Sequence, residues 1–269
     1  MKVANKVVVV TGAGSGMGRQ LALELVSRGA KVALVDFRAQ TLAETAQLVE
    51  AKGGKCSQHV LDVSDAAAVA ALPAAVEAAL GAPDALINNA GIIQPFVKIN
   101  DLELSAAAHV MAVNFTGPLM LTKAFLPGLL KRSEAHILNV SSMGAYAPVP
   151  GQSVYGASKA AVKLFTEGLR SELMGTPVGV TIVFPGAINT NISVNSGMAM
   201  PANADDAAAA AKFKTTEADV AARMMVDAIE KNQPRVCVGQ DSKMMDIMTR
   251  LNPVWAAGVI YKQMASLLK

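Results

Sequence analysis

Residues 7–18 read VVVVTGAGSGMG, a run of four valines followed by a turn that contains four glycines. A run of valines is typical of a buried strand, and residues 17–28 after the turn follow a helical pattern. Glycines let the backbone approach a ligand closely, while the start of a helix offers free N–H groups to phosphate. This order of strand, turn and helix is typical of dinucleotide binding. We therefore expect a dinucleotide to lie against Gly12, Ser15, Gly16, Met17 and Gly18.

The rest of the chain repeats this alternation of short β-branched runs and longer helical stretches. Strands are expected at residues 6–10, 31–36, 57–61, 85–87, 135–140, 178–184 and 235–238, and helices at 17–28, 39–52, 66–80, 105–132, 154–174 and 217–230. Apolar strands joined by crossover helices form a parallel sheet that is covered on both faces. The sequence therefore predicts an α/β fold, a doubly wound Rossmann sheet of about seven strands. No linker divides the chain, so we expect one domain over residues 1–269.

Composition and charge exclude several classes of protein. Hydrophobic residues make up 52% of the chain and charged residues 17%, which excludes a disordered protein. The net charge is only +3 and basic residues are interspersed with acidic ones, so we expect no nucleic-acid partner. The sequence contains no run of about 18 uncharged apolar residues, so no membrane span is expected. The first valines lead into the turn without a cleavage site, which favours a cytoplasmic protein. No His/Cys cluster has the spacing of metal ligands, so no metal site is expected.

An acidic residue at the end of the second strand bears on the choice of cofactor. Asp36 lies 18 residues beyond Gly18. A carboxylate in this place accepts both hydroxyls of an adenosine ribose and repels a 2′-phosphate. Positions 13–17 hold no Arg or Lys, although Arg38 is nearby. We therefore expect NAD as the preferred cofactor and NADP as the less favoured one.

A tyrosine, a lysine and a serine together predict acid–base chemistry. Tyr155 and Lys159 are four residues apart and share one helix face. A nearby ammonium favours the phenolate and lowers the pKa of a phenol from about 10, which suits proton exchange. Ser142 precedes Tyr155 by 13 residues and follows a strand, where its hydroxyl can stabilise a substrate oxygen. We favour Ser142 over Ser141 because neighbouring strand residues face opposite ways.

With these motifs in this order, the sequence resembles the short-chain dehydrogenase/reductase family from Lys6 to about Val238. The matching positions are Thr11–Gly18, Asp62-Val63, Asn88–Gly91, Asn114, Ser142, Tyr155, Lys159, and Pro185-Gly186 with Thr190. The resemblance implies an NAD(P)-dependent oxidoreductase that interconverts a secondary alcohol and a ketone. It also implies a homodimer or homotetramer, with helices 105–132 and 154–174 in the interface.

The resemblance also assigns a role to individual residues. It implies four catalytic residues, Asn114, Ser142, Tyr155 and Lys159, with Asn114 holding a water that links Lys159 to solvent. Asp62 and Val63 would hold the adenine, and Ala90 and Gly91 would pass close to its ribose. Ile188 and Thr190 would anchor the carboxamide. The implied cofactor site beyond the turn and Asp36 is Asp62, Val63, Asn89, Ala90, Gly91, Tyr155, Lys159, Pro185, Gly186, Ile188 and Thr190.

Two further regions are expected to shape the substrate site. Residues 189–214 are placed as a substrate flap, and Gln94, Met143, Gly144 and Gln152 are expected to line the pocket. Few of these residues are charged, which favours a mainly apolar substrate.

The extension over residues 241–269 has helical spacing that breaks at Pro253. Three places are open for this extension. It is expected to pack on its own or a neighbouring subunit, to form an apolar wall or lid for the pocket, or to contact a membrane surface.

Two other functions share this scaffold. An epimerase or dehydratase would use the same Tyr–Lys pair, but such relatives carry a T-G-x-x-G-x-x-G turn and a longer C-terminal domain. A non-catalytic dinucleotide sensor could lose Ser142, Tyr155 or Lys159, and all three are present. The sequence therefore favours a dehydrogenase or reductase.

Overall fold

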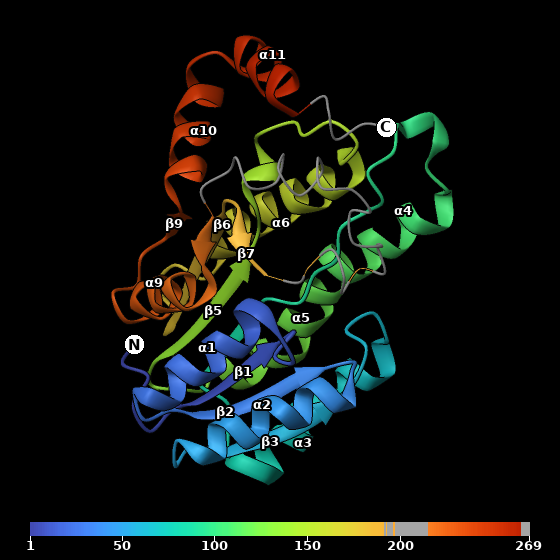
Figure 1. The fold of residues 1–269 in the computed structure, drawn as a ribbon. Helices are drawn as coiled ribbons and strands as arrows, with labels where there is room; N and C mark the ends of the chain where they lie inside the picture. The colour runs from blue at the N-terminus through green and yellow to red at the C-terminus, as the bar shows by residue number, and fades with distance from the viewer. Residues whose placement is uncertain (191, 193–195, 197–214, 265–269) are drawn as a thin grey trace.

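A seven-stranded parallel sheet forms the centre of the computed structural model, which describes residues 1–190, 192, 196 and 215–264 (Figure 1). The strand order is β3-β2-β1-β4-β5-β6-β9, and every neighbouring pair in it is parallel. The strands are β1 Val7–Thr11, β2 Lys31–Asp36, β3 Cys56–Val60, β4 Ala85–Asn88, β5 Ala135–Val140, β6 Val178–Pro185 and β9 Arg235–Val238. A second small sheet pairs β7 (Ile188–Asn189) with β8 (Thr216–Glu217). The predicted doubly wound sheet is confirmed.

Helices cover both faces of the sheet, because successive side chains of each strand point to opposite faces. In β1, Val8 and Val10 pack under one set of helices, and Val7 and Val9 under the other. The first set is α1 Gly16–Ser27, α2 Ala39–Ala51 and α9 Ala218–Glu230. The second is α3 Ala66–Leu80, α5 Gly117–Leu129 and α6 Ser153–Glu172. The four valines thus pack into two cores, one on each face of the sheet. This explains why apolar and polar residues do not alternate along β1.

The helix expected over residues 105–132 is divided in the structure. It consists of α4 (Leu104–Met111), a π-helical turn η2 (Ala112–Thr116) and α5. Pro118 has no N–H, so the usual bond to the carbonyl of Asn114 cannot form, and the regular α pattern is interrupted. Such π turns occur mostly at functional sites, and this one carries Asn114.

The same helical run is the one candidate for a membrane span among the described residues. Leu104–Leu129 is long and apolar enough by length and composition alone. Helices of globular cores meet the same criterion, and here Leu121, Phe125 and Leu129 of α5 pack into the core beneath the sheet.

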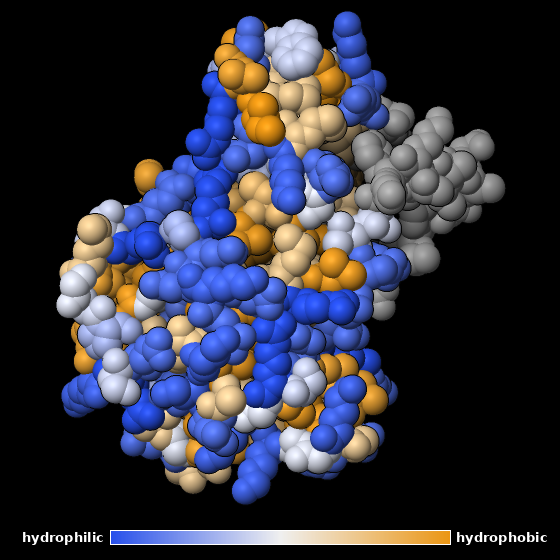
Figure 2. All heavy atoms as spheres, turned by 90° about the vertical axis from the view of Figure 1, so that its left-hand side faces the viewer, coloured by the Kyte–Doolittle hydropathy of each residue, from blue (hydrophilic) through white to orange (hydrophobic). Residues whose placement is uncertain are grey.

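The C-terminal extension forms two helices, α10 (Gln240–Leu251) and α11 (Pro253–Met264), which project from the sheet (Figure 1). The predicted break at Pro253 is confirmed. Met245 and Ile260 on the inner side pack against Ala147 of the same chain. The outer side leaves apolar residues exposed (Figure 2), namely Met244, Ile247, Leu251, Val254, Trp255 and Tyr261. None of the residues from 240 to 264 lines the cleft described below.

The predicted flap at 189–214 lies outside the described residues, except for Asn189, Thr190, Ile192 and Ser196. The described residues also include two short 3₁₀ turns, η1 (Ile99–Asp101) and η3 (Met143–Ala145), the latter directly after β5.

Candidate active site

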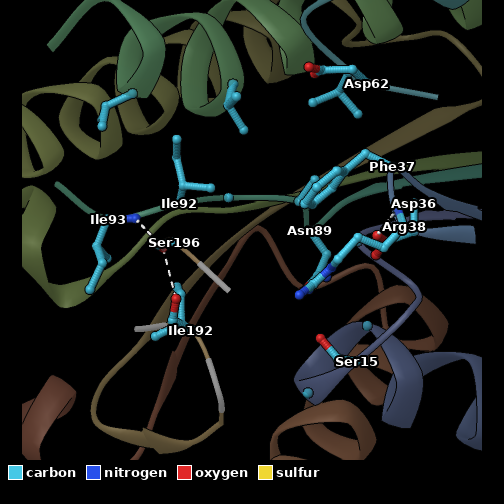
Figure 3. A pocket seen from close by; sticks show the side chains of 18 of the residues that line it. Ser15, Asp36, Phe37, Arg38, Asp62, Asn89, Ile92, Ile93, Ile192 and Ser196 are labelled. Carbon is cyan, nitrogen blue, oxygen red and sulfur yellow. Dashed lines mark hydrogen bonds between the residues drawn. The ribbon is translucent and has the colours of Figure 1, made fainter. Parts of the chain in front are cut away.

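A cleft of about 350 Å³ lies at the carboxyl ends of β1, β2 and β4, where β1 and β4 are neighbours in the sheet (Figure 3). Open parallel sheets bind ligands at this edge, where the strand order reverses. The structure places most of the predicted cofactor residues on its wall: Gly12, Ser15, Gly16, Met17, Gly18, Asp36, Asp62, Val63, Asn89, Ala90, Gly91 and Thr190.

The glycine-rich turn forms the floor of the cleft. Gly12 and Gly16 have φ angles of 67° and 52°, a backbone region that favours glycine. A side chain at Gly18 would collide with the carbonyl oxygen of Gly12. Each of these positions therefore requires glycine, and the turn can lie close to a ligand.

Asp36 is fixed at the cleft by two backbone donors. Its carboxylate accepts hydrogen bonds from the Gly14 N–H at 2.9 Å and the Arg38 N–H at 3.0 Å. The side chain is buried, so its charge lies in a part of the cleft that little water reaches. The Arg38 guanidinium lies 5.1 Å from the centroid of the Phe37 ring, and both residues line the same cleft.

Two buried polar atoms on the cleft residues have no hydrogen-bond partner among the described residues. They are Oδ1 of Asn89 and Nε of Arg38. A buried polar group without a partner is costly, so a ligand with hydroxyl and phosphate groups suits this wall. Together with the glycine turn and Asp36, these atoms fit a nicotinamide dinucleotide.

Ser142 and Tyr155 come together at the end of β5. Ser142 follows the strand and Tyr155 lies in the first turn of α6. Their side chains are neighbours, because a Cβ atom at Gly144 would lie 3.5 Å from Ser142 Oγ and 3.4 Å from the Tyr155 ring. The Gly144 N–H also donates to Ser142 Oγ at 3.1 Å. Ser141 instead donates its hydroxyl to the Lys159 carbonyl at 2.7 Å, inside the protein. Of the two serines, Ser142 is thus the one beside the phenol.

The electrostatics of Tyr155 differ from the expectation drawn from its sequence neighbours. Burial raises the pKa of Tyr155 above the ordinary value, and the hydrogen bond with Ser142 acts in the opposite direction. Lys159 Nζ lies 5.9 Å from the centroid of the Tyr155 ring. At this separation the ammonium does not offset the cost of desolvating a phenolate. The expected lowering of the Tyr155 pKa by Lys159 is therefore absent in the free protein.

Lys159 is almost fully buried beneath the cleft. Its Nζ donates to the Val140 carbonyl at 3.1 Å, and burial lowers the pKa of Lys159 to about 8. A Cβ atom at Gly91 would lie 3.1 Å from this nitrogen. Because Gly91 lines the cleft, the predicted catalytic residue Lys159 directly adjoins the predicted cofactor site.

Asn114 ties the loop after β4 to α6. Its Oδ1 accepts from the Ile92 N–H at 2.9 Å, and its Nδ2 donates to the Ile92 carbonyl at 2.9 Å. The same amide nitrogen donates to Ser158 Oγ at 3.0 Å. Asn114 is fully buried, and its amide connects the cleft wall at Ile92 with α6 at Ser158.

Several predicted residues lie elsewhere or make other contacts. Pro185, Gly186, Ile188, Tyr155 and Lys159 do not line the cleft. Ile188 packs against the core beside α9. Gln94 reaches the cleft wall, but its amide bonds to backbone groups. Gln152 is buried away from the cleft, and neither Met143 nor Gly144 lines it. A Cβ at Gly144 would lie 3.4 Å from the Tyr155 ring.

Sequence reasoning missed part of the wall. The additional lining residues are Phe37, Arg38, Leu61, Ile92, Ile93, Pro95, Ala106, His109, Val110, Val113, Ile192 and Ser196. Four of them, Ala106, His109, Val110 and Val113, follow helical spacing, so the sequence indicates that they share one helix face. Ser196 accepts a hydrogen bond from the Ile93 N–H and donates to the Ile192 carbonyl, a contact that links distant segments (Figure 3).

Comparison with known proteins agrees with this geometry. A family profile described as short chain dehydrogenase matches residues 6–201. A Mycobacterium tuberculosis protein named as an oxidoreductase, SadH, is 39% identical over 253 residues, covering 91% of this chain and 90% of its own.

Two solved structures are also similar. A short-chain dehydrogenase/reductase from Burkholderia phymatum in complex with NAD has a TM-score of 0.85 and 29% identity, covering 94% of this chain and 95% of its own. A metagenomic short-chain oxidoreductase in complex with NADP has a TM-score of 0.74 and 28% identity, covering 88% and 98%. The chain therefore belongs to the short-chain dehydrogenase/reductase family of oxidoreductases.

Proposed function

We propose that this oxidoreductase interconverts a secondary alcohol and a ketone, with NAD(H) as its preferred cofactor. The observation that carries the proposal is the proximity of the Ser142 and Tyr155 side chains, one helical turn from the buried Lys159 and next to the cleft. A hydroxyl pair in this place can hold a carbonyl oxygen and give it a proton.

Each residue of the site has its own role in the proposed reaction. The nicotinamide, when bound, supplies the hydride that forms the new C–H bond at the carbonyl carbon. Ser142 donates a hydrogen bond to the substrate oxygen, and Tyr155 transfers its hydroxyl proton to that oxygen, which completes the alcohol. Lys159 lies on the inner side of Tyr155 and stabilises the phenolate that remains. Asn114 keeps Ile92 and Ser158 in place beside this pair.

The preference for NAD rests on Asp36. Its carboxylate is buried at the cleft and held by two N–H groups, so it cannot turn away from an added phosphate. Bringing a 2′-phosphate beside this charge would be unfavourable. Similar structures contain either NAD or NADP, and Asp36 is the feature of this chain that favours NAD.

The proposed substrate is mainly apolar. The lining of the cleft includes five aliphatic side chains, Ile92, Ile93, Val110, Val113 and Ile192, beside the polar Gln94, His109 and Ser196. Such a surface gains little from a sugar phosphate or a carboxylic acid, and it stabilises hydrocarbon groups by removing them from water.

A ketone panel tests this proposal. NADH and NADPH that carry deuterium at both C4 positions are mixed with cyclohexanone, acetophenone, 2-tetralone and a 3-oxosteroid, with pyruvate as the charged comparison. We expect alcohol that carries one deuterium at the carbinol carbon, formed from apolar ketones and at least about tenfold more efficiently with NADH. Activity confined to pyruvate, or a clear preference for NADPH, would contradict the corresponding part of the proposal.

We also propose a cytoplasmic homodimer or homotetramer. Leu130, directly after α5, and Leu164 of α6 are exposed and lie within residues 105–132 and 154–174, which the family resemblance places in an interface. The apolar outer side of α10 and α11 suits burial in the same assembly. Sedimentation equilibrium measures the mass in solution, and a monomer that binds lipid vesicles would instead favour a membrane surface for this extension.

A further inference from the structure

The first turn of α6 receives its hydrogen-bond acceptor from a distant part of the chain. The first N–H groups of any α-helix lack partners within the helix. The residue at the N-cap position, Gln152, makes no side-chain bond to them. The Gln94 Oε1 accepts from the Val154 N–H at 2.8 Å and from the Tyr155 N–H at 2.9 Å. Gln94 therefore caps the N-terminus of α6, although it lies far from this helix in the sequence.

The amide nitrogen of Gln94 binds the loop that precedes α6. Its Nε2 donates to the Gly151 carbonyl at 2.9 Å, just before the helix begins. In return, Gln152 Nε2 donates to the Gln94 backbone carbonyl at 2.7 Å. Both glutamines are almost completely buried, so water does not compete for these bonds. The two side chains join the loop after β4 to the start of the catalytic helix.

We propose that Gln94 is a positioning residue for Tyr155, a role that rests on the function proposed above. The Tyr155 N–H is held by Gln94, while the Tyr155 phenol meets Ser142, which lies on another loop. A small shift of the first turn of α6 would separate the two hydroxyls. Both acceptor sites of Oε1 are used, so this oxygen has no place for a substrate hydroxyl.

Two substitutions separate this role from a general effect on stability. Gln94→Met keeps the size of the side chain and removes its acceptor, which leaves two buried N–H groups unpaired. Gln94→Glu keeps the acceptor and adds a negative charge near the tyrosine. Asp65→Ala is the matched control, because Asp65 caps α3 through the Ala67 and Ala68 N–H groups and does not line the cleft.

Turnover is measured on the whole protein with NADH and the best ketone of the panel. For Gln94→Met we expect kcat to fall about tenfold or more, since a misplacement near 1 Å can be this costly. The KM for the ketone and the Kd for NADH should stay within about twofold. Asp65→Ala should keep the wild-type kcat although it loses a comparable helix cap.

A titration without substrate provides a second measurement. The chain has three tyrosines, so the phenolate absorbance of Tyr155 is the difference between each protein and the same protein with Tyr155→Phe. Lys159 is the ionisable side chain that faces the Tyr155 ring. We expect Gln94→Met to raise the Tyr155 pKa by weakening the bond with Ser142, and Gln94→Glu to raise it by its charge. Asp65→Ala should leave it unchanged.

Wild-type kcat and an unchanged Tyr155 pKa in Gln94→Met would overturn the positioning role. Equal losses of kcat and of NADH affinity would overturn it too, because they would place the effect on the cofactor. If Gln94→Met does not fold, an unchanged Tyr155 pKa in Gln94→Glu has the same consequence. If Tyr155→Phe itself keeps full turnover, the proposed function fails; if only Gln94→Met does, the positioning role alone fails.

Discussion

Lys159 brings a charged group into the interior of the protein. It is 4% exposed, and within the described part of the chain its Nζ has one hydrogen bond, to the Val140 carbonyl. Burial favours the neutral amine, which is why the pKa of Lys159 falls from 10.5 to about 8. At neutral pH most of the molecules still carry the ammonium, so this buried charge destabilises the folded state, although the proposed reaction requires it.

Replacing this lysine should therefore stabilise the protein and impair its activity. We expect Lys159→Met to raise the free energy of unfolding at pH 7 by about 1–3 kcal/mol in denaturant titrations. A lowered pKa means that the unfolded chain binds more protons between pH 8 and 10.5, so the wild type gains stability over that range. The difference in the free energy of unfolding between Lys159→Met and the wild type should thus narrow as the pH rises through this range. A difference that stays constant with pH would show that the charge is not its cause.

Single residues differ in how far the sequence alone reveals them. Ser142 follows a strand, and Tyr155 and Lys159 share a helix face, so local spacing is enough to propose them as site residues. The contacts of Gln94 depend on how two loops 57 residues apart meet, and nothing local indicates them. The direction of the Tyr155 pKa was also missed, because it depends on burial rather than on a neighbour in sequence.

At the level of elements, the start of α10 is fastened to the segment after β6. Asp241, in the first turn of α10, accepts a hydrogen bond from the Ala187 N–H at 2.6 Å. A side chain at Gly186 would collide with the Asp241 carboxylate. The segment 185–190 includes Thr190, which lines the cleft, so the C-terminal extension supports one wall of the proposed cofactor site.

Asp241→Ala should consequently weaken cofactor binding. It leaves the Ala187 N–H unpaired and loosens the segment that reaches Thr190, so we expect the Kd for NADH to rise about fivefold or more. Fluorescence titration of NADH gives this value. Asp246→Ala is the control, because Asp246 of the same helix pairs with Arg235 and Arg250 instead. Equal Kd values for the two variants would contradict the link between α10 and the cofactor site.

Most element boundaries lie within one or two residues of those expected, because apolar periodicity and turn residues determine them locally. The exception is residues 105–132, which were expected as one helix and are divided by η2. Periodicity does not register the extra residue of a π turn, and Pro118 in the middle of an apolar run was the available sign.

At the level of the whole molecule, the alternation of strands and helices was enough to predict the parallel sheet. Crossovers in such sheets are right-handed, which restricts the strand order to few choices. The observed order makes β1 and β4 neighbours and so opens the cleft between the glycine turn and Asn89. The inner packing of α10 and α11 on Ala147 was not foreseeable, because it depends on where two loops leave the sheet.

The most direct test is the steady-state rate of NADH oxidation by Tyr155→Phe with the best ketone of the panel. Tyr261→Phe serves as the control, since Tyr261 is exposed on α11, away from the cleft. We expect Tyr155→Phe to lose about 10²–10⁴-fold in turnover, the usual contribution of a general acid, and to bind NADH nearly as before. Turnover in Tyr155→Phe equal to that of the wild type would show that this phenol does not transfer the proton.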